Sequence, residues 1–309
     1  MKLTRRQSLL SLCAASVAAG SPGTLYDKWR HVAGETDGVV GAAVWHLPSG
    51  QTVHLNGEQV FPLASVCKLP IAMNVLAMVD EGKLGIDQSI EVLPQDVYPG
   101  VSDVAKRWPK QTRFPLSELL QLMVANSDNT AVETLFRIGG GAPGLAARFR
   151  KWRVTGIRID RSEEQITFDT SGVEHCPPVE QWTGDLFHEL IAKTTPETRY
   201  RGLQRLIADP RDTATPNATV QLLARVFKGE LLSKPGTARL VEILKSTTTG
   251  PGRLKGLLPA GTVVAHKTGT SYTEKGLKRG DQRCGCDLSA EGGRPTRGGR
   301  LHQRKHPRQ

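Results

Sequence analysis

The 309-residue sequence lacks the features by which membrane-spanning and zinc-binding proteins are usually identified. After residue 20, no stretch reaches the roughly 18 apolar residues that a membrane-spanning helix needs. Only five cysteines occur, and the one close pair, Cys284 and Cys286, has a single residue between its members and no second pair. The usual zinc-site spacings are therefore absent. Cys67 lies in an apolar stretch, which is typical of a small core residue rather than a reactive thiol.

The formal net charge of +11 suggests an anionic partner such as nucleic acid, but the charge is confined to the two ends of the chain. Residues 275–309 contain ten Lys or Arg and three acidic residues, and residues 1–6 contain three basic residues and no acidic one. The remaining segment, 7–274, has 28 basic and 27 acidic residues. A nearly neutral body gives no support for a nucleic-acid-binding domain.

The first 20 residues are predicted to be a signal peptide. Basic residues are followed by a run of Leu, Ala, Ser and Cys and then by small residues, with cleavage expected between Ala18 and Ser21. Residues 4–10 also resemble a twin-arginine signal. The alternative, a short buried helix, fits the charged flank less well. The mature protein is expected to be soluble and either periplasmic or secreted, with no membrane span.

The pattern of apolar residues predicts strands near both ends of the chain and helices between them. The segments that carry these patterns are a β-hairpin over 39–55, a strand over 261–265, and helices over 26–33, 65–80, 116–123, 130–138, 219–227 and 238–245. This order is typical of an α+β protein in which an antiparallel sheet flanked by helices is interrupted by an inserted all-α domain. The expected division is a discontinuous sheet domain (24–61 and 246–274), an all-α domain (62–245) and a basic, Gly-rich tail (275–309).

Ser65 and Lys68 lie three residues apart at the predicted start of a helix, so their side chains share one face. A serine hydroxyl is a poor nucleophile at neutral pH and needs a base beside it, and a lysine amine can be that base. The helix N-terminus adds free N–H groups and the positive end of the helix dipole. The spacing is common by chance, so it carries weight only together with other motifs.

Two further motifs follow, Ser127-Asp128-Asn129 and Lys267-Thr268-Gly269. In one interpretation Ser127 relays a proton to a leaving nitrogen, Asn129 donates a hydrogen bond to a substrate amide, and Lys267 anchors a carboxylate. In the structural alternative Ser127 is a helix N-cap and Lys267 is a solvated charge at the end of a strand. The order and spacing of all three motifs together favour the catalytic interpretation.

In this order the three motifs resemble those of the penicillin-recognising serine enzymes, a group that includes class A β-lactamases and penicillin-binding proteins. The resemblance covers about residues 24–273 and is strongest to the extended class A subgroup, because residues 247–251 and 265–270 are also similar. It implies a β-lactamase/transpeptidase-like fold and hydrolysis of penicillins or cephalosporins through an acyl-enzyme on Ser65. It further implies a monomer without a metal or organic cofactor, and a role in antibiotic resistance.

The resemblance also implies roles for residues outside the three motifs. Residues 160–163 look like the start of the class A omega loop, so Glu163 is expected to activate the water that deacylates the enzyme. Arg161 is expected to pair with Asp212 and so to close an omega loop over 160–212. The structural alternative leaves Glu163 as a solvated side chain beside Glu164.

Substrate contacts follow from the same resemblance. The backbone N–H groups of Ser65 and Thr270 are expected to form the oxyanion hole. Lys267, Thr268 and Thr270 are expected to bind the substrate carboxylate, with Gly269 completing the motif. Arg253 lies nearby in sequence but belongs to no motif that would assign it a role.

Two features depart from the family pattern. Thr167 occupies the position where the family usually has an asparagine that helps to hold the hydrolytic water, so the water is expected to be held differently and turnover to be slower. The omega loop is also unusually long, and the helical pattern over 189–207 predicts an inserted element, interpreted as a lid over the site.

The tail departs most strongly. From residue 275 the chain contains seven Gly and no Val, Ile, Phe or Met, and it shows neither strand nor helix periodicity. The last strands and the final helix of the fold are therefore expected to be missing. One hypothesis is a reading-frame shift near codons 275–280, and the alternative is a genuine basic tail that binds an anionic surface.

Two other functions stay open from the sequence. A D-alanyl-D-alanine transpeptidase or carboxypeptidase has the same three motifs but no effective counterpart of Glu163. An inactive, truncated relic would retain the motifs and lose the fold, because the net stability of a domain is only about 5–15 kcal/mol.

Overall fold

A computed structural model describes residues 24–100, 102–256, 258–259, 261–271, 273–274, 276–278 and 281–287. The predicted signal peptide, residues 1–20, and the end of the chain after residue 287, including the expected absence of a final helix, lie outside the described residues. Within the described part, no helix is both long and apolar enough to cross a membrane.

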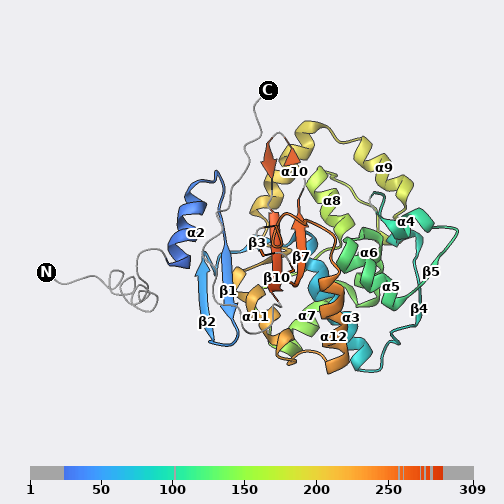
Figure 1. Cartoon of the computed structure of the whole chain (residues 1–309). Helices are drawn as coiled ribbons and strands as arrows, with labels where there is room; N and C mark the ends of the chain where they lie inside the picture. The colour runs from blue at the N-terminus through green and yellow to red at the C-terminus, as the bar shows by residue number, and fades with distance from the viewer. Residues whose placement is uncertain are drawn as a thin grey trace.

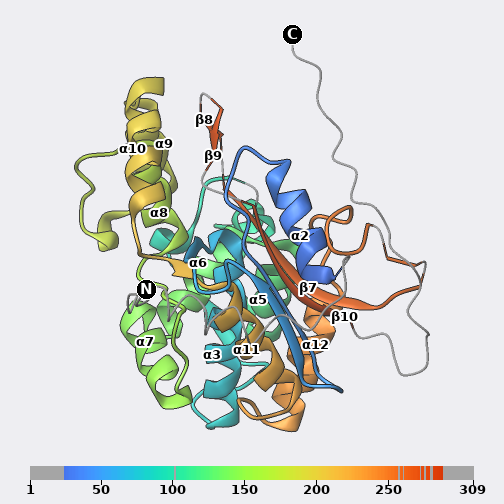
Figure 2. The same ribbon diagram turned by 90° about the vertical axis from the view of Figure 1, so that its left-hand side faces the viewer.

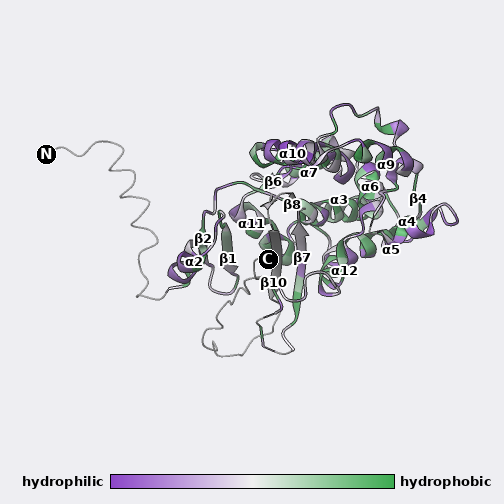
Figure 3. Cartoon of the chain, turned by 90° about the horizontal axis from the view of Figure 1, so that it is seen from above, coloured by the Kyte–Doolittle hydropathy of each residue, from purple (hydrophilic) through white to green (hydrophobic). Residues whose placement is uncertain are grey.

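Two antiparallel ladders lie side by side and form the sheet half of the molecule (Figures 1 and 3). The first is the predicted hairpin, β1 (Ala42–His46) with β2 (Gln51–Leu55). The second joins β7 (Val264–Thr270) to β10 (Asp281–Asp287). Helix α2 (Leu25–Gly34) contacts β2, and helix α11 (Pro216–Phe227) contacts both β1 and β10.

Strand β10 corrects the expectation that the tail supplies no strand. Its seven residues align with β7 so that Cys284 lies opposite Lys267 and Gly285 opposite His266. A ladder is built from backbone N–H and C=O groups, so it forms without the apolar side chains on which the sequence argument relied. Two short strands, β8 (Thr273–Glu274) and β9 (Leu277–Lys278), form a turn between β7 and β10.

The helical half is built around α3 (Lys68–Asp80), which is buried on every side from Lys68 to Ala77. A helix that is apolar all round is the central helix of a core, because no face is left for water. The helices near it in sequence or space are α4 (Asp103–Arg107), α5 (Leu116–Gln121), α6 (Asn129–Ile138), α7 (Gly141–Trp152) and α12 (Lys234–Lys245). Helix α12 contacts both α3 and β7, and so connects the two halves.

The segment predicted to be all-helical also contains short strand pairs. Strands β4 (Ser89–Glu91) and β5 (Arg113–Pro115) pair with each other, and β6 (Thr213–Ala214) pairs with β3 (Phe61–Pro62). The second pair brings the far end of the long omega segment back beside the residues that precede Ser65.

The long omega segment contains α8 (Glu163–Ser171), α9 (Gly184–Ala192) and α10 (Pro196–Ala208) (Figure 2). The single helical element expected over 189–207 is two helices. The break is explained by Thr195, which caps α10, and by Pro196 in its first turn, a position that favours a helix start. Helix α10 packs along α8, so the insertion lies against the omega helix.

Candidate active site

Ser65 lies in a 3₁₀ turn (Ala64–Cys67) that runs directly into α3, so Ser65 and Lys68 are one turn apart. The Lys68 Nζ is 3.2 Å from the Ser65 Oγ. Ala64 has a positive φ of 45°, an unusual conformation for a residue with a Cβ. Such strained backbone is concentrated at functional sites, and here it comes directly before the serine.

The Lys68 amine group is fully buried and surrounded by oxygen atoms. It donates to the Ser127 backbone oxygen at 2.8 Å and to the Asn129 Oδ1 at 2.6 Å, and it is 3.2 Å from the Ser127 Oγ. The Glu163 Oε1 lies 3.9 Å away. A buried amine is stable only with such partners, and this lysine therefore joins the first two motifs and the omega segment at one point.

The loop that carries Ser127 and Asn129 is fixed by the residue between them. Asp128 caps α6 by accepting from the Ala131 N–H at 2.9 Å, and it also accepts from the Ser102 hydroxyl at 2.8 Å. Ser127 adopts a left-handed conformation, with φ of 62°. Asp128 is thus a structural residue that turns the two neighbouring side chains toward Lys68.

Lys267 closes the site from β7. Its Nζ donates to the Ser127 Oγ at 3.0 Å, so the Ser127 hydroxyl lies between the amines of Lys267 and Lys68. Gly269 explains how β7 comes so close to the serine. A Cβ at this position would lie 2.8 Å from the Leu63 backbone oxygen and 3.1 Å from the Ser65 nitrogen. Only glycine allows this approach.

The sequence assigned no role to Arg253, whose side chain contacts β7 in the structure. Its guanidinium donates to the Gly269 oxygen at 3.1 Å and to the Thr270 hydroxyl at 2.6 Å. The Thr268 hydroxyl lies 2.7 Å from the Thr249 hydroxyl. The signal that could have found Arg253 is the turn sequence Gly250-Pro251-Gly252, which folds the chain back along the strand.

Glu163 is the first residue of α8, after the N-cap Ser162. Besides its approach to Lys68, its Oε1 accepts from the Cys67 thiol at 3.6 Å. Burial and, secondarily, the charge of Glu163 raise the pKa of Cys67 well above its usual value, so the thiol stays protonated and acts as a donor. Cys67 is therefore a buried neighbour of the site and not a nucleophile.

Arg161 and Asp212 lie in direct contact across the long omega segment. The Arg161 Nε is 2.6 Å from an Asp212 carboxylate oxygen, and both side chains are 2 % exposed. The other carboxylate oxygen accepts from the backbone N–H groups of Asp160 and Arg161. The ends of the segment are thus joined although 50 residues lie between these two side chains.

The Thr167 hydroxyl contacts two residues, Glu163 and Tyr98. Its hydroxyl donates to the Glu163 backbone oxygen at 2.9 Å and lies 2.8 Å from the Tyr98 hydroxyl. Tyr98 was not found from the sequence, because it approaches from a loop 69 residues away. No local pattern around it signals the contact.

Two buried carboxyl groups meet at the start of α8: Glu164 belongs to α8, and Glu133 belongs to α6. The Glu164 N–H donates to the Glu133 Oε1 at 2.9 Å, and the Glu164 Oε1 has no protein partner. Burial is the main cause that raises the pKa of each group to about 8, and the neighbouring carboxylates add to it. This pair, too, was missed from the sequence.

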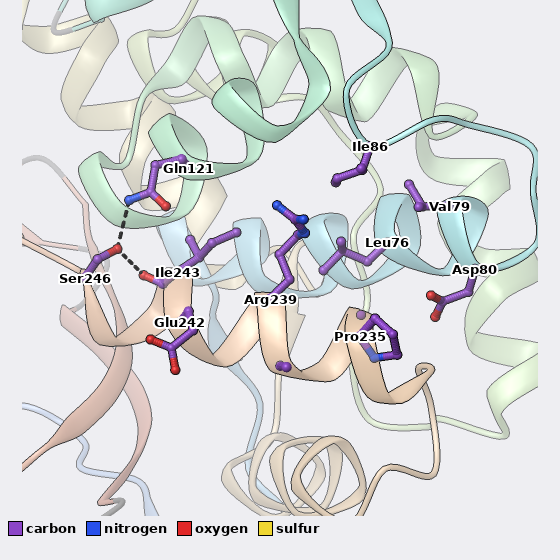
Figure 4. Close-up of a pocket in the computed structure, with 12 residues that line it drawn as sticks. Leu76, Val79, Asp80, Ile86, Gln121, Pro235, Arg239, Glu242, Ile243 and Ser246 are labelled. Atoms are coloured by element: carbon purple, nitrogen blue, oxygen red, sulfur yellow. Dashed lines mark hydrogen bonds between the residues drawn. The ribbon is translucent and has the colours of Figure 1, made fainter.

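A cavity of about 570 Å³ lies between α3 and α12, away from these residues (Figure 4). Leu76, Val79 and Ile243 give it an apolar wall, and none of the motif residues lines it. Among the described residues, no group of three or more His, Cys, Asp or Glu side chains is placed to hold a metal ion.

Comparisons with known proteins agree with this geometry. The sequence model of a family described as "Beta-lactamase enzyme family" matches residues 24–278. β-Lactamase VEB-1 of Pseudomonas aeruginosa is 32 % identical over 77 % of this chain and 69 % of its own length. Extended-spectrum β-lactamase PER-1 of the same organism is 30 % identical over 91 % of this chain and 78 % of its own length.

Solved structures show the same relationship. A β-lactamase from Chitinophaga pinensis superposes with a TM-score of 0.67 at 33 % identity, covering 84 % of this chain and 83 % of that protein. The TLA-1 extended-spectrum β-lactamase superposes with a TM-score of 0.64 at 29 % identity, covering 81 % of this chain and 78 % of that one.

Proposed function

Because this chain belongs to the β-lactamase enzyme family, we propose that it hydrolyses the β-lactam amide of penicillins and cephalosporins with Ser65 as its nucleophile. It is a class A serine β-lactamase of the extended type. The observation that carries the assignment of residues is the single cluster around Lys68, in which Ser65, Ser127, Asn129 and Glu163 all lie within 4 Å of one amine.

Acylation uses the contacts on the serine side of this cluster. The Ser65 Oγ attacks the lactam carbonyl, and its proton passes either to Lys68, 3.2 Å away, or through a water to Glu163. The C–N bond of the lactam breaks, and an ester forms on Ser65. The nitrogen takes up a proton through Ser127, whose hydroxyl is held between Lys68 and Lys267.

Binding contacts surround the reacting carbonyl. Asn129 accepts from Lys68 through its Oδ1, so its amide N–H groups are turned away from Lys68 and can donate to a substrate amide. The backbone N–H groups of Ser65 and Thr270 form the oxyanion hole, in which each donor contributes about 3–4 kcal/mol. The substrate carboxylate binds Lys267 and the hydroxyls of Thr268 and Thr270.

Arg253 adds a second cation to this end of the site. Its donation to the Thr270 hydroxyl places the guanidinium beside the proposed carboxylate position. A planar guanidinium can bind two oxygens of one carboxylate, which a lysine cannot do. Arg253 thus supports the carboxylate end of the site together with Lys267.

Deacylation separates this proposal from a transpeptidase or carboxypeptidase. Glu163 takes a proton from a water, and the resulting hydroxide attacks the ester on Ser65 and frees the enzyme. Its carboxylate lies at the cluster, 3.9 Å from the Lys68 amine, rather than out in solvent. The Arg161–Asp212 ion pair fixes the omega segment that carries it. The transpeptidase alternative lacks such a base and is not favoured.

The test is hydrolysis of a chromogenic cephalosporin by the purified chain and two variants. Ser65→Ala is expected to abolish turnover, and Glu163→Gln is expected to reduce turnover by at least about 1,000-fold while leaving acylation in place. Glu180→Gln, which changes an exposed glutamate of the same segment, is the matched control and should retain full activity. Unchanged turnover in Ser65→Ala would refute the proposal.

The setting of the enzyme is also proposed. Residues 1–20 serve as an export signal, the enzyme acts in the periplasm or outside the cell as a monomer, and its activity protects the cell from β-lactam antibiotics. The sheet domain (24–61 and 246–274) and the helical domain (62–245) meet at the site, with Lys267 supplied by the first and Ser65 by the second. Cell fractionation and a resistance assay with and without residues 1–20 test these statements.

A further inference from the structure

Tyr98 connects the rigid helical core to the helix that carries Glu163. Its backbone N–H donates to the Thr130 hydroxyl on α6 at 3.1 Å. The 3₁₀ turn just before it (Pro94–Asp96) is held to α6 by an ion pair between Asp96 and Arg137. Its side chain then reaches α8, where the phenol lies 2.8 Å from the Thr167 hydroxyl. Tyr98 therefore joins α6 to α8.

The direction of these hydrogen bonds follows from the number of donors. A threonine hydroxyl has one hydrogen, and Thr167 uses it to donate to the Glu163 backbone oxygen at 2.9 Å. Tyr98 must then donate to Thr167. Burial raises the pKa of Tyr98 to about 12, so the phenol remains a donor at neutral pH. A two-bond chain thus runs from Tyr98 to the backbone of Glu163.

The inserted helix α9 holds the Tyr98 ring in place. The ring centroid of Phe187 on α9 lies 5.4 Å from that of Tyr98 and 5.3 Å from that of Phe168 on α8. Trp182 completes a small apolar core, 5.2 Å edge-on from Phe168. Phe168, Phe187 and Trp182 are all buried. The insertion therefore packs on the omega helix and on Tyr98.

We propose that Tyr98 is a positioning residue for Glu163, and that the insertion, through Phe187, braces Tyr98 against α8. This inference rests on the proposed role of Glu163 in deacylation. Thr167 occupies the position where the family pattern has an asparagine. The two hydrogen bonds from Tyr98 through the Thr167 hydroxyl restrain the backbone of Glu163 at this position. The insertion acts as a support of the omega helix and not as a lid. Loss of the brace shifts Glu163 relative to the ester, and small displacements of a catalytic group reduce rates strongly.

The test is Tyr98→Phe, which removes the hydroxyl and keeps the ring. Deacylation is measured directly, by intact mass, as the decay of the acyl-enzyme after excess cephalosporin is removed. We expect this rate to fall about three- to tenfold, while the acylation rate and kcat/KM stay within about twofold of the unmodified enzyme. Tyr26→Phe on the remote helix α2 is the matched control and should change neither rate.

A second variant tests the path. Thr167→Val is nearly isosteric and removes the hydroxyl in the middle of the chain, so it should slow deacylation by a similar factor. The double variant with Tyr98→Phe should be no slower than the slower single variant, because both changes break the same chain. Phe187→Ala should give the same selective loss of the deacylation rate. Additive losses in the double variant would contradict the path.

The outcomes are distinguishable. Normal deacylation in Tyr98→Phe, or an equal loss of acylation and deacylation, overturns the positioning role while the proposed function stands. An unmodified enzyme that forms no acyl-enzyme and hydrolyses no substrate overturns the proposed function and this inference with it.

Discussion

The buried carboxyl pair Glu133 and Glu164 should make the stability of the enzyme fall as the pH rises. Both side chains are nearly inaccessible, at 7 % and 1 % exposed, and each pKa is raised from 4.5 to about 8. A raised pKa means that the folded state keeps a proton that the unfolded chain releases. The stabilising effect is complete below about pH 4.5 and is lost as the pH rises from there to about 8.

The magnitude follows from linkage. Each group that stays protonated only in the folded state lowers the free energy of unfolding by about 1.4 kcal/mol per pH unit within this window. The carboxyl groups with lowered pKa, such as Asp209 at about 2, titrate in acid, below this window. Burial lowers the pKa of His266 from 6.5, so this side chain adds stability as the pH rises toward about 6.5 and opposes the slope equally in the unmodified enzyme and in the variants. Glu164→Gln removes one of the two carboxyl ionisations, so it should make the slope less steep by about 1.4 kcal/mol per pH unit.

Urea unfolding at several pH values from 5.5 to 7.5 measures this slope. Glu164→Gln should be more stable than the unmodified enzyme at pH 7.5. The amide is uncharged at every pH, whereas the buried carboxyl must take up a proton that it would release in the unfolded chain. Glu180→Gln, at an exposed glutamate, should leave the slope unchanged. Equal slopes in the unmodified enzyme and in Glu164→Gln would show that Glu164 does not keep a proton in the folded state at these pH values.

Three further predictions concern the site. Asp212→Asn removes the carboxylate that pairs with the Arg161 Nε, while Asp169 and Asp209 still pair with its Nη1. It should lower the free energy of unfolding by about 1.5–3 kcal/mol, as measured by urea unfolding at pH 5.5. Gly269→Ala places a Cβ 2.8 Å from the Leu63 oxygen and pushes β7 away from the serine. In the fraction that folds, kcat/KM for a cephalosporin should fall by at least about tenfold, and the unfolding midpoint should fall as well, because the clash is with backbone atoms that cannot swing aside. Arg253→Ala should raise KM by about tenfold and change kcat much less, and Arg253→Lys should restore only part of the loss; an unchanged KM would contradict its place at the carboxylate.

The sequence predicted most of the elements and the contacts that depend on short motifs. Ser65 and Lys68 could be placed together because one helical turn fixes their distance. The start of α10 could have been predicted from Thr195 and Pro196, which local capping rules cover. The helix α7 was missed because it begins at Gly141 in a glycine-rich stretch that local rules treat as a stop.

The contacts that the sequence did not predict join residues far apart in the chain. Tyr98 reaches Thr167, Glu164 donates to Glu133, and Arg253 lies along β7, and each contact depends on how separate elements pack. Neither the periodicity of apolar residues nor the spacing of motifs predicts contacts between residues so far apart in the chain. The same holds for the insertion, whose helical pattern was visible while its docking on α8 was not.

The tail combines a correction with an open hypothesis. Residues 281–287 form β10 despite their composition. In the segment that leads into β1, however, Val39 is 64 % exposed, and helix α2 buries none of its residues. Apolar side chains left in solvent agree with the reading-frame hypothesis, in which the covering part of the fold is replaced. Translating the other two frames after codon 280 tests it: a frame that encodes an apolar strand and an amphipathic helix supports the shift, and the absence of one in both frames contradicts it.

In the proposed mechanism Ser65 carries the acyl group and Glu163 removes it. Intact-mass measurement of Glu163→Gln mixed with one equivalent of a penicillin tests this most directly. We expect a stoichiometric adduct that persists for hours, is located on the peptide containing Ser65, and is short-lived in the unmodified enzyme. An adduct that Glu163→Gln clears as fast as the unmodified enzyme would exclude Glu163 as the deacylating base, and one located on another residue would exclude Ser65 as the nucleophile.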